Sequence, residues 1–237
     1  MSDSPVVIVT GAGGGLGNAL VAEFAAKGWR VAAGFHGTPP PGENEQIFNA
    51  ALDVTNTAAI AAAVDEVVSR WGRIDALVNN AGVTDDQPAW QMDEIAWQRV
   101  LDVNLKGAFL CSQAVCRRMI RQRDGHIINI SSFSGRVGQR GQANYAAAKA
   151  GLFGLTTSLA QEVGSRNVRV NAVLPGVLPT RMTAKLSEAE LQQFAEANAL
   201  GRINSLDEVA RFVVFLASTK NISGQVFQLD SRIAPWT

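Results

Sequence analysis

Short apolar runs alternate along this chain with longer stretches that carry apolar residues at helical spacing. The β-branched run at 6–10 is followed by apolar positions at Leu16, Leu20 and Phe24, and the alternation continues almost to the last residue. Apolar runs of about four to eight residues are typical of strands buried on both faces of a parallel sheet. Strands that alternate with helices in this way indicate right-handed βαβ units.

The same pattern predicts where each element lies. Strands are expected at 6–10, 31–35, 48–54, 74–78, 127–130, 168–174 and 226–229. Helices are expected at 18–27, 58–71, 93–121, 143–163 and 207–217. We therefore predict an α/β fold in one domain, residues 1–237, with a Rossmann-type doubly wound parallel sheet of about seven strands and helices on both faces. The polar, Ala-rich stretch at 180–200 is expected to form a mobile lid over the substrate.

Composition and charge exclude several classes of protein. Lys plus Arg equals Asp plus Glu, at 21 each, which argues against nucleic-acid binding through bulk charge. Cys111 and Cys116 lie in a helical pattern without a metal-ligand spacing, so we expect core thiols, no metal site and a reducing compartment. No apolar run approaches the ~18 residues of a membrane span, and no targeting segment opens the chain. The prediction is a cytoplasmic protein with no membrane partner.

A glycine-rich loop lies directly between the first predicted strand and the first predicted helix. It includes Gly11, Gly15 and Gly17. Glycines allow the backbone to turn sharply and to approach a pyrophosphate, which the free N–H groups at the helix start then face. The strict G-x-G-x-x-G fingerprint is absent because Leu16 occupies its last glycine position. The position of the loop nevertheless predicts a dinucleotide site.

The second predicted strand bears on which dinucleotide binds. An acid about 20 residues beyond the loop would hold the adenosine ribose of NAD, but none occurs between 30 and 42. His36 stands in that region instead. The absence of a carboxylate favours NADP over NAD, although no arginine replaces the acid. An ordinary solvated loop histidine is an equally good interpretation of His36.

Tyr145 and Lys149 lie four residues apart in the predicted helix 143–163. Residues at this spacing share a helix face, and a cation within about 4–6 Å of a phenol lowers its pKa. We therefore expect Lys149 to lower the pKa of Tyr145, the only tyrosine in the chain, and to fit it for proton transfer. Two unrelated residues on one face would give the same spacing, so the pair alone does not establish a site.

Other polar residues follow strand ends or interrupt helices. The loops after Thr10, Asp53, Val78 and Ile130 are expected at the carboxyl edge of the sheet, where ligands bind. Asp53 could equally be a turn residue at the end of a strand. Asn104 lies in the middle of a predicted helix, which is unfavourable unless its side chain has a role, caps or bends the helix, or points to water.

Taken in order, these residues form a series of motifs. The series is Thr10-Gly11-xxx-Gly15-x-Gly17, Asp53, Asn79-Asn80-Ala81-Gly82, Asn104, Ser132, Tyr145-xxx-Lys149 and Pro175-Gly176-xxx-Thr180. Its order and spacing resemble the short-chain dehydrogenase/reductase family over nearly the whole chain. The resemblance implies an oxidoreductase that uses NADP, or NAD as the alternative, to interconvert a ketone and a secondary alcohol.

The resemblance also implies a role for each matching residue. Tyr145 would donate the proton to the carbonyl oxygen, Ser132 would hydrogen-bond that oxygen, and Lys149 would hold the nicotinamide ribose and tune Tyr145. Ser131 could replace Ser132, but the spacing to Tyr145 favours Ser132. Asn104 would hold a water that links Lys149 to solvent. The implied cofactor contacts are Gly11, Gly15, Leu16 and Gly17 for the pyrophosphate, Asp53 and Val54 for the adenine, Asn80, Ala81 and Gly82 for the ribose, Pro175, Gly176 and Thr180 for the nicotinamide, and His36 near the adenosine.

Within the family, the segment 141–152 is similar to 3-oxoacyl-acyl-carrier-protein reductases and to acetoacetyl-CoA reductases. Both groups reduce a β-keto thioester with NADPH, in the first case for fatty-acid synthesis. The resemblance implies carrier-protein docking at Arg123 and Arg166, which could also be plain solvated charges. It further implies a homotetramer that pairs helices near 108–118 and 153–163.

Three positions depart from this subgroup. Gly14 replaces a basic residue that often helps to hold the 2′-phosphate, Asp85 replaces another basic residue, and the tail has Asp230-Ser231-Arg232-Ile233 where a glycine pair is usual. A carbonyl reductase or alcohol dehydrogenase for another small substrate is therefore a second hypothesis, and a dinucleotide-binding regulator without turnover is a third. A Ser-His-Asp hydrolase is excluded because the G-x-S-x-G elbow and a downstream histidine are absent.

Overall fold

The computed structural model describes residues 4–233 except 38 and 182, and in them the strands form one parallel sheet. The strands are β1 (Val6–Val9), β2 (Arg30–Phe35), β3 (Ile47–Ala51), β4 (Ala76–Asn79), β5 (Gly125–Ile130), β6 (Val168–Leu174) and β7 (Val226–Gln228). Their order in the sheet is β3-β2-β1-β4-β5-β6-β7, and every neighbouring pair is parallel. The predicted fold class is confirmed.

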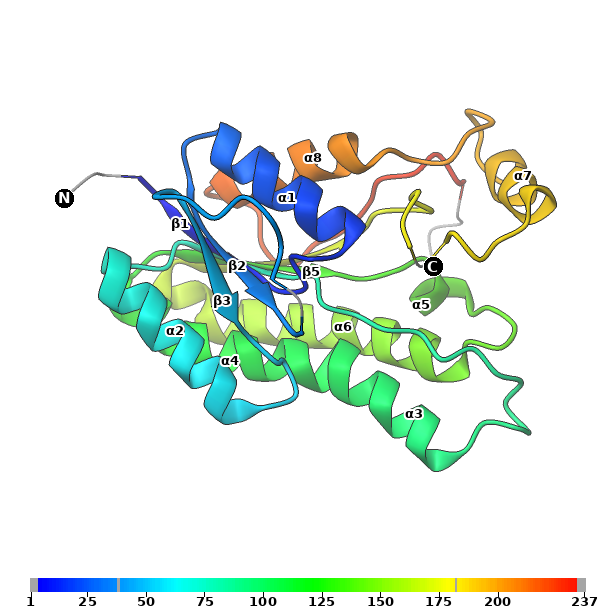
Figure 1. Cartoon of the computed structure of the whole chain (residues 1–237), viewed down its shortest axis with the longest axis horizontal. Helices are drawn as coiled ribbons and strands as arrows, with labels where there is room; N and C mark the ends of the chain where they lie inside the picture. Colours follow the sequence, from blue (N-terminus) through cyan, green and yellow to red (C-terminus); the bar gives the residue numbers. More distant parts are fainter. Residues whose placement is uncertain (1–3, 38, 182, 234–237) are drawn as a thin grey trace.

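Helices cover both faces of the sheet (Figure 1). They are α1 (Gly15–Ala26), α2 (Thr57–Trp71), α3 (Glu94–Leu101), a π-helical turn (Asp102–Lys106), α4 (Gly107–Gln122), α5 (Ser134–Val137), α6 (Ala143–Val163), a 3₁₀ turn (Gly164–Arg166), α7 (Glu188–Glu196) and α8 (Leu206–Ser218). Figure 1 shows α1 and α8 on one face and α2, α4 and α6 on the other. In the part of the chain that the structure describes, none of these helices is long and apolar enough to cross a bilayer.

Two apolar layers hold the helices against the sheet. Leu20 and Phe24 of α1 pack with Val213 of α8 on one face. Ile60 of α2 and Met119 of α4 are buried on the other face. Each fully buried side chain of this size contributes about 1.5–3 kcal/mol. The two layers therefore hold the strand ends, and the loops that follow them, in a fixed arrangement.

Three predicted elements differ from the structure at positions that matter for the site. The helix predicted at 18–27 begins at Gly15, so Gly15, Leu16 and Gly17 form its first turn. The predicted strand 48–54 ends at Ala51 because the Asp53 carboxylate accepts hydrogen bonds from the Thr55 N–H and hydroxyl, which turns the chain toward α2. The predicted single helix 93–121 forms as α3, the π-helical turn and α4 in succession. A π-helical turn inserts one residue into the helix and is often found at functional sites.

Candidate active site

The glycine loop follows β1, at the point where the strand order of the sheet reverses. There β2 lies on one side of β1 and β4 lies on the other. Gly11 has φ +65°, and a Cβ there would lie 2.8 Å from the Ala81 Cα. A Cβ on Gly17 would lie 2.3 Å from the Gly11 carbonyl oxygen. No other residue type fits either position without moving backbone. The loop can therefore pack this closely against itself and against Ala81 only because both residues are glycines.

The N-terminus of α1 faces this loop with its backbone donors available. Its N-cap is Gly14, and no side chain of the described residues caps the first turn. Unpaired N–H groups and the helix dipole together favour a bound anion. The pyrophosphate of a nicotinamide dinucleotide therefore fits the loop, with Gly15, Leu16 and Gly17 at the helix start.

Thr10 joins the glycine loop to the segment after β4. Its hydroxyl accepts hydrogen bonds from the backbone N–H groups of Asn80 and Ala81, both at 3.0 Å. The Asn80 amide in turn donates to the carbonyl oxygens of Thr10 and Gly11, at 2.9 and 3.1 Å. The predicted pyrophosphate and ribose segments are thus one hydrogen-bonded unit. The place of Thr10 in the motif gave no indication of this role for its hydroxyl.

Asn104 occupies the π-helical turn and faces the interior of the site. Its amide nitrogen donates to the carbonyl oxygens of Val83 and Val100, each at 2.9 Å. Its Oδ1 is buried and has no hydrogen-bond partner among the described residues. A Cβ on Gly82 would lie 2.7 Å from this oxygen and 3.6 Å from the Lys149 Nζ. The free oxygen therefore points into the space that Lys149 also borders.

Lys149 is buried, and its ammonium donates to the Ile130 carbonyl oxygen at 2.8 Å. Burial lowers the pKa of Lys149 to about 8, because desolvation disfavours the charged form. The adjacent Ser131 hydroxyl donates to the Lys149 carbonyl oxygen at 2.8 Å and is itself buried. Ser131 is therefore engaged in holding the helix, which leaves Ser132 as the serine that faces the site.

Tyr145 and Lys149 lie together, but the pKa of the phenol moves opposite to the sequence-based expectation. The Lys149 Nζ is 5.6 Å from the centre of the Tyr145 ring. Burial raises the pKa of Tyr145 to about 12, while its hydrogen bond with Ser132 lowers it and the Asp86 charge raises it. The expectation was wrong because desolvation outweighs the favourable contacts. The phenol is consequently protonated at neutral pH.

The N-terminus of α6 is held in place by a side chain that sequence reasoning missed. Asn144 is fully buried, and its Oδ1 accepts from the Tyr145 N–H at 2.7 Å. Its amide nitrogen donates to the carbonyl oxygens of Asp85 and Ala96, at 3.1 and 3.3 Å. A side-chain amide that links three backbone segments fixes the position of Tyr145. The sequence contains no signal for this, because the three partners are distant in the chain.

The residues expected at the adenosine end lie beside β2 and β3. Asp53 is within 3.6 Å of the exposed His36 ring. The pKa of the Asp53 carboxyl is lowered, chiefly because the carboxylate accepts hydrogen bonds from Thr55. The Val54 side chain is buried, and a Cβ on Gly107 would lie 2.8 Å from it. Asp53 therefore forms the ordinary turn that the sequence left open, and it lies beside His36.

The segment 175–180 closes the site opposite the helix start. Gly176 has φ +80°, and a Cβ there would lie 2.7 Å from the Asp230 Cβ. At the other end of the segment, a Cβ on Gly15 would lie 3.1 Å from the Thr180 Cγ2. The Pro175 carbonyl oxygen accepts from the Asn204 amide at 2.9 Å. The predicted nicotinamide segment thus contacts the glycine loop at one end and the C-terminal tail at the other.

Arg123 and Arg166 are not part of this arrangement. Arg123 ends α4 just before β5, and Arg166 lies just before β6, so both stand at the amino edge of the sheet. They lie beyond the far end of α6, whose 21 residues span about 30 Å. Neither arginine is near Tyr145 of the same chain.

The sequence of this chain is similar to those of known proteins. The family model described as short chain dehydrogenase matches residues 5–191. A 3-oxoacyl-acyl-carrier-protein reductase of Thermotoga maritima is 41% identical, covering 98% of this chain and 98% of that protein. Proteins of the same name from Staphylococcus aureus and Staphylococcus epidermidis are 41% and 40% identical, each covering 94% of this chain and at least 95% of their own length. The protein belongs to the short-chain dehydrogenase/reductase family of oxidoreductases.

Proposed function

We propose that this protein reduces the ketone of a 3-oxoacyl thioester to a secondary alcohol with NADPH. One observation carries the proposal: Asn104, Lys149, Tyr145 and Ser132 converge beside a glycine loop that fits a dinucleotide. The substrate class is supported by the names of relatives that match over nearly the whole chain.

The side chains of the site supply the proton that the substrate oxygen takes up, and they stabilise the negative charge that develops on that oxygen. A bound nicotinamide supplies the hydride that adds to the carbonyl carbon. Ser132 donates a hydrogen bond to the carbonyl oxygen, which stabilises the negative charge as it develops. Tyr145 donates its proton to the same oxygen, and its high pKa keeps the phenol protonated until then. The products are the alcohol and a phenolate.

The phenolate must recover a proton before the next turnover. The Lys149 ammonium stabilises the phenolate electrostatically, and its lowered pKa lets it pass a proton on near neutral pH. Asn104 Oδ1, buried and unpaired among the described residues, can accept from a water that leads protons to Lys149. This assigns a purpose to the π-helical turn, which aims the oxygen inward.

The Tyr145→Phe variant tests the proposed chemistry directly. Without the hydroxyl, kcat for acetoacetyl-CoA should fall by roughly 10²–10⁴-fold. The Kd for NADPH should stay within about twofold, because the ring still fills the same space. Following NADPH absorbance gives the rate, and fluorescence titration gives the affinity. Turnover near that of the native protein would refute the mechanism, and a native protein that binds NADPH without turning over any keto thioester would indicate a regulator.

NADPH is proposed over NADH on the composition of the adenosine end. No carboxylate occurs between 30 and 42, and Asp53 is engaged by its own turn with Thr55. A 2′-phosphate would therefore meet the exposed His36 rather than a free acid. The ratio of kcat/KM with the two cofactors measures this preference.

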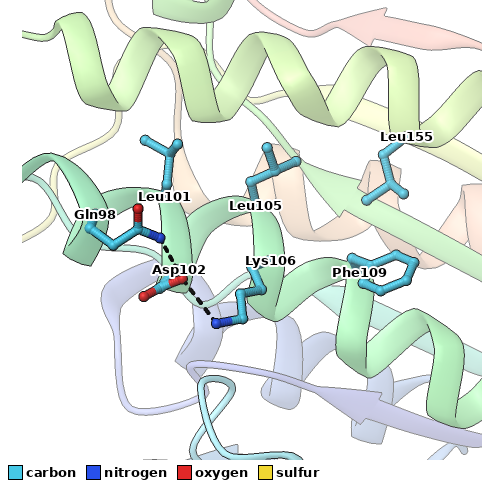
Figure 2. A pocket seen from close by; sticks show the side chains of 7 residues that line it. All are labelled: Gln98, Leu101, Asp102, Leu105, Lys106, Phe109 and Leu155. Carbon is cyan, nitrogen blue, oxygen red and sulfur yellow. Dashed lines mark hydrogen bonds and ion pairs between the residues drawn. The ribbon is translucent and has the colours of Figure 1, made fainter.

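A homotetramer is proposed on the exposed apolar surface of the helical layers. Figure 2 shows Leu101, Leu105, Phe109 and Leu155 lining a groove between the π-turn region and α6, beside the polar row Gln98, Asp102 and Lys106. Phe109 is 41% exposed, and Phe215 on α8 is 62% exposed. Exposed apolar residues on two different helices suit two interfaces. Light scattering should give four chains, and Phe109→Arg should give a smaller species.

Carrier-protein docking at Arg123 and Arg166 is proposed only as part of that assembly. Because both lie at the far end of α6 from Tyr145, a carrier bound there would serve the site of another subunit. Reversing both charges to glutamate should raise KM for a 3-oxoacyl carrier protein roughly tenfold and leave KM for acetoacetyl-CoA unchanged. Equal effects on both substrates, or none, would argue against docking there.

The segment 180–200 is proposed as the lid of the substrate site. It carries α7, which begins with a capping box in which Ser187 and Glu190 bond to each other's backbone. No residue of α7 is buried, so the helix has few apolar contacts to hold it. Hydrogen exchange that slows in this segment when NADPH and substrate analogue bind would support a lid.

A further inference from the structure

The C-terminal tail contains an ion pair that is almost completely removed from water. The Asp230 side chain is 2% exposed and the Arg232 side chain is 12% exposed. The Arg232 Nε donates to Asp230 Oδ2 at 2.6 Å, and the second guanidinium nitrogen contacts the same oxygen. Burying such a pair costs desolvation free energy, so it is weak evidence for stability. A contribution to stability therefore does not account for the presence of this ion pair.

Both members of the pair contact segments that border the active site. The Arg232 guanidinium lies over the Phe133 ring at 3.8 Å, and Phe133 directly follows Ser132. Asp230 packs against Gly176 so closely that a Cβ on that glycine would come within 2.7 Å of the Asp230 Cβ. The pair thus touches the segment of the proposed oxyanion donor and the segment expected at the nicotinamide.

Gln228 extends the contact to the rest of α5. Its Oε1 accepts from Arg136 at 3.1 Å, and its amide donates to Asp230 Oδ1 at 2.7 Å and to the Arg232 carbonyl oxygen at 2.9 Å. On its other side, α5 packs against the catalytic helix: a Cβ on Gly135 would lie 2.6 Å from the Ala150 nitrogen. The short α5 is therefore held between α6 and the tail.

We propose that Asp230 and Arg232 are positioning residues for the carbonyl substrate, which act through Phe133 and Gly176 to hold Ser132 and the nicotinamide segment at a fixed separation. The inference rests on the proposed role of Ser132. A four-residue helix cannot fix its own position, because helices this short are not stable alone. The tail supplies the missing constraint with a planar guanidinium, which stacks on the ring and pairs with the carboxylate at once.

The Arg232→Met variant tests the positioning role, with Arg121→Met, an exposed arginine at the end of α4, as the matched control. Arg232→Met should lower kcat for acetoacetyl-CoA roughly tenfold, since small displacements of positioning groups slow the reaction by that factor. Arg121→Met should leave kcat unchanged. The Kd for NADPH should stay within about twofold. Arg232→Lys should recover part of kcat, because lysine keeps the charge but not the stacked fork. Native kcat in Arg232→Met would overturn the proposal.

A coupling measurement separates positioning from general support of the fold. In a Ser132→Ala background, Arg232→Met should lower kcat by less than about twofold, because the group that it positions is gone. Equal fold-losses with and without Ser132 would overturn the proposal. If Arg232→Met lowers the melting temperature strongly, Gln228→Leu replaces it, because this variant removes the hydrogen bond to Arg136 and leaves the ion pair. It must then lower kcat less in the Ser132→Ala background than in the native protein. A native rate in Ser132→Ala alone would refute the proposed function instead.

Discussion

Two regions contact the segment 175–180, the glycine loop near Thr180 and the C-terminal tail at Gly176, and they are built on different principles. The glycine loop depends on the absence of side chains. Because Gly11 and Gly17 have no Cβ, the backbone at these positions packs directly against other backbone. The tail works through long side chains, with Gln228, Asp230 and Arg232 bonded to one another. A site made from backbone tolerates almost no added atoms, whereas a side-chain network loses function gradually as single bonds are removed.

Among the changes that test this comparison, the largest effect is expected from adding one methyl group to the glycine loop. In Gly17→Ala the new Cβ would lie 2.3 Å from the Gly11 oxygen and 2.8 Å from the Ala12 Cα, so the loop must move. We expect NADPH affinity to fall by roughly 100-fold, or ~2.8 kcal/mol at ~1.4 kcal/mol per tenfold. Fluorescence titration measures it.

Gly14→Ala is the matched control for that change. A Cβ on Gly14 would lie 3.4 Å from the Gly11 oxygen, which is an ordinary contact, and the residue has negative φ. Its affinity for NADPH should stay within about threefold, the cost of a weaker N-cap. If the two variants bind alike, close backbone approach is not what makes this loop a binding site.

The pH dependence of the reaction tests the electrostatics of Tyr145 and Lys149. Lys149 titrates at a lowered pKa of about 8 and loses its positive charge above it, whereas Tyr145, at about 12, keeps its proton. The kcat/KM for reduction, with NADPH as the varied substrate, should therefore fall about tenfold per pH unit above that point. A profile that stays flat to pH 10 would contradict the assigned role of Lys149.

A change at the adenosine end should alter cofactor preference by an intermediate amount. His36→Asp places a carboxylate where it can bond ribose hydroxyls and repel a 2′-phosphate. We expect the ratio of kcat/KM for NADPH over NADH to fall roughly tenfold, since screening limits the repulsion at this exposed position. His36→Asn is the uncharged control and should change the ratio little. A ratio unmoved by the aspartate would mean that His36 lies away from the ribose.

The smallest effect is expected where the tail meets the proposed lid. Asn198 is buried, and its Oδ1 accepts from the Ser231 N–H at 3.0 Å. Asn198→Ala should raise KM for acetoacetyl-CoA about threefold, because one hydrogen bond contributes ~0.5–1.5 kcal/mol. Ser187→Ala weakens α7 at its start without touching the tail and should leave KM closer to native. A larger effect in the control would place the influence in the helix rather than in the tail.

Most of the fold followed from local pattern. The helix that carries Tyr145 and Lys149 was predicted at 143–163 and forms as Ala143–Val163, because an Ala-rich segment without proline favours helix. The sixth strand likewise forms at Val168–Leu174 as predicted. The strand expected at 48–54 was too long, since hydrophobicity alone does not show that the Asp53 carboxylate will turn the chain.

The site was only partly predictable for the same reason. The sequence by itself determined the parallel sheet, the glycine loop and the four-residue spacing of Tyr145 and Lys149, because these depend on neighbours along the chain. Only the tertiary structure decided the direction of the pKa shift of Tyr145, the orientation of Asn104 Oδ1 and the contact of Arg232 with Phe133. Desolvation and long-range hydrogen bonds arise from residues that meet only when the chain is folded, and no local pattern encodes them.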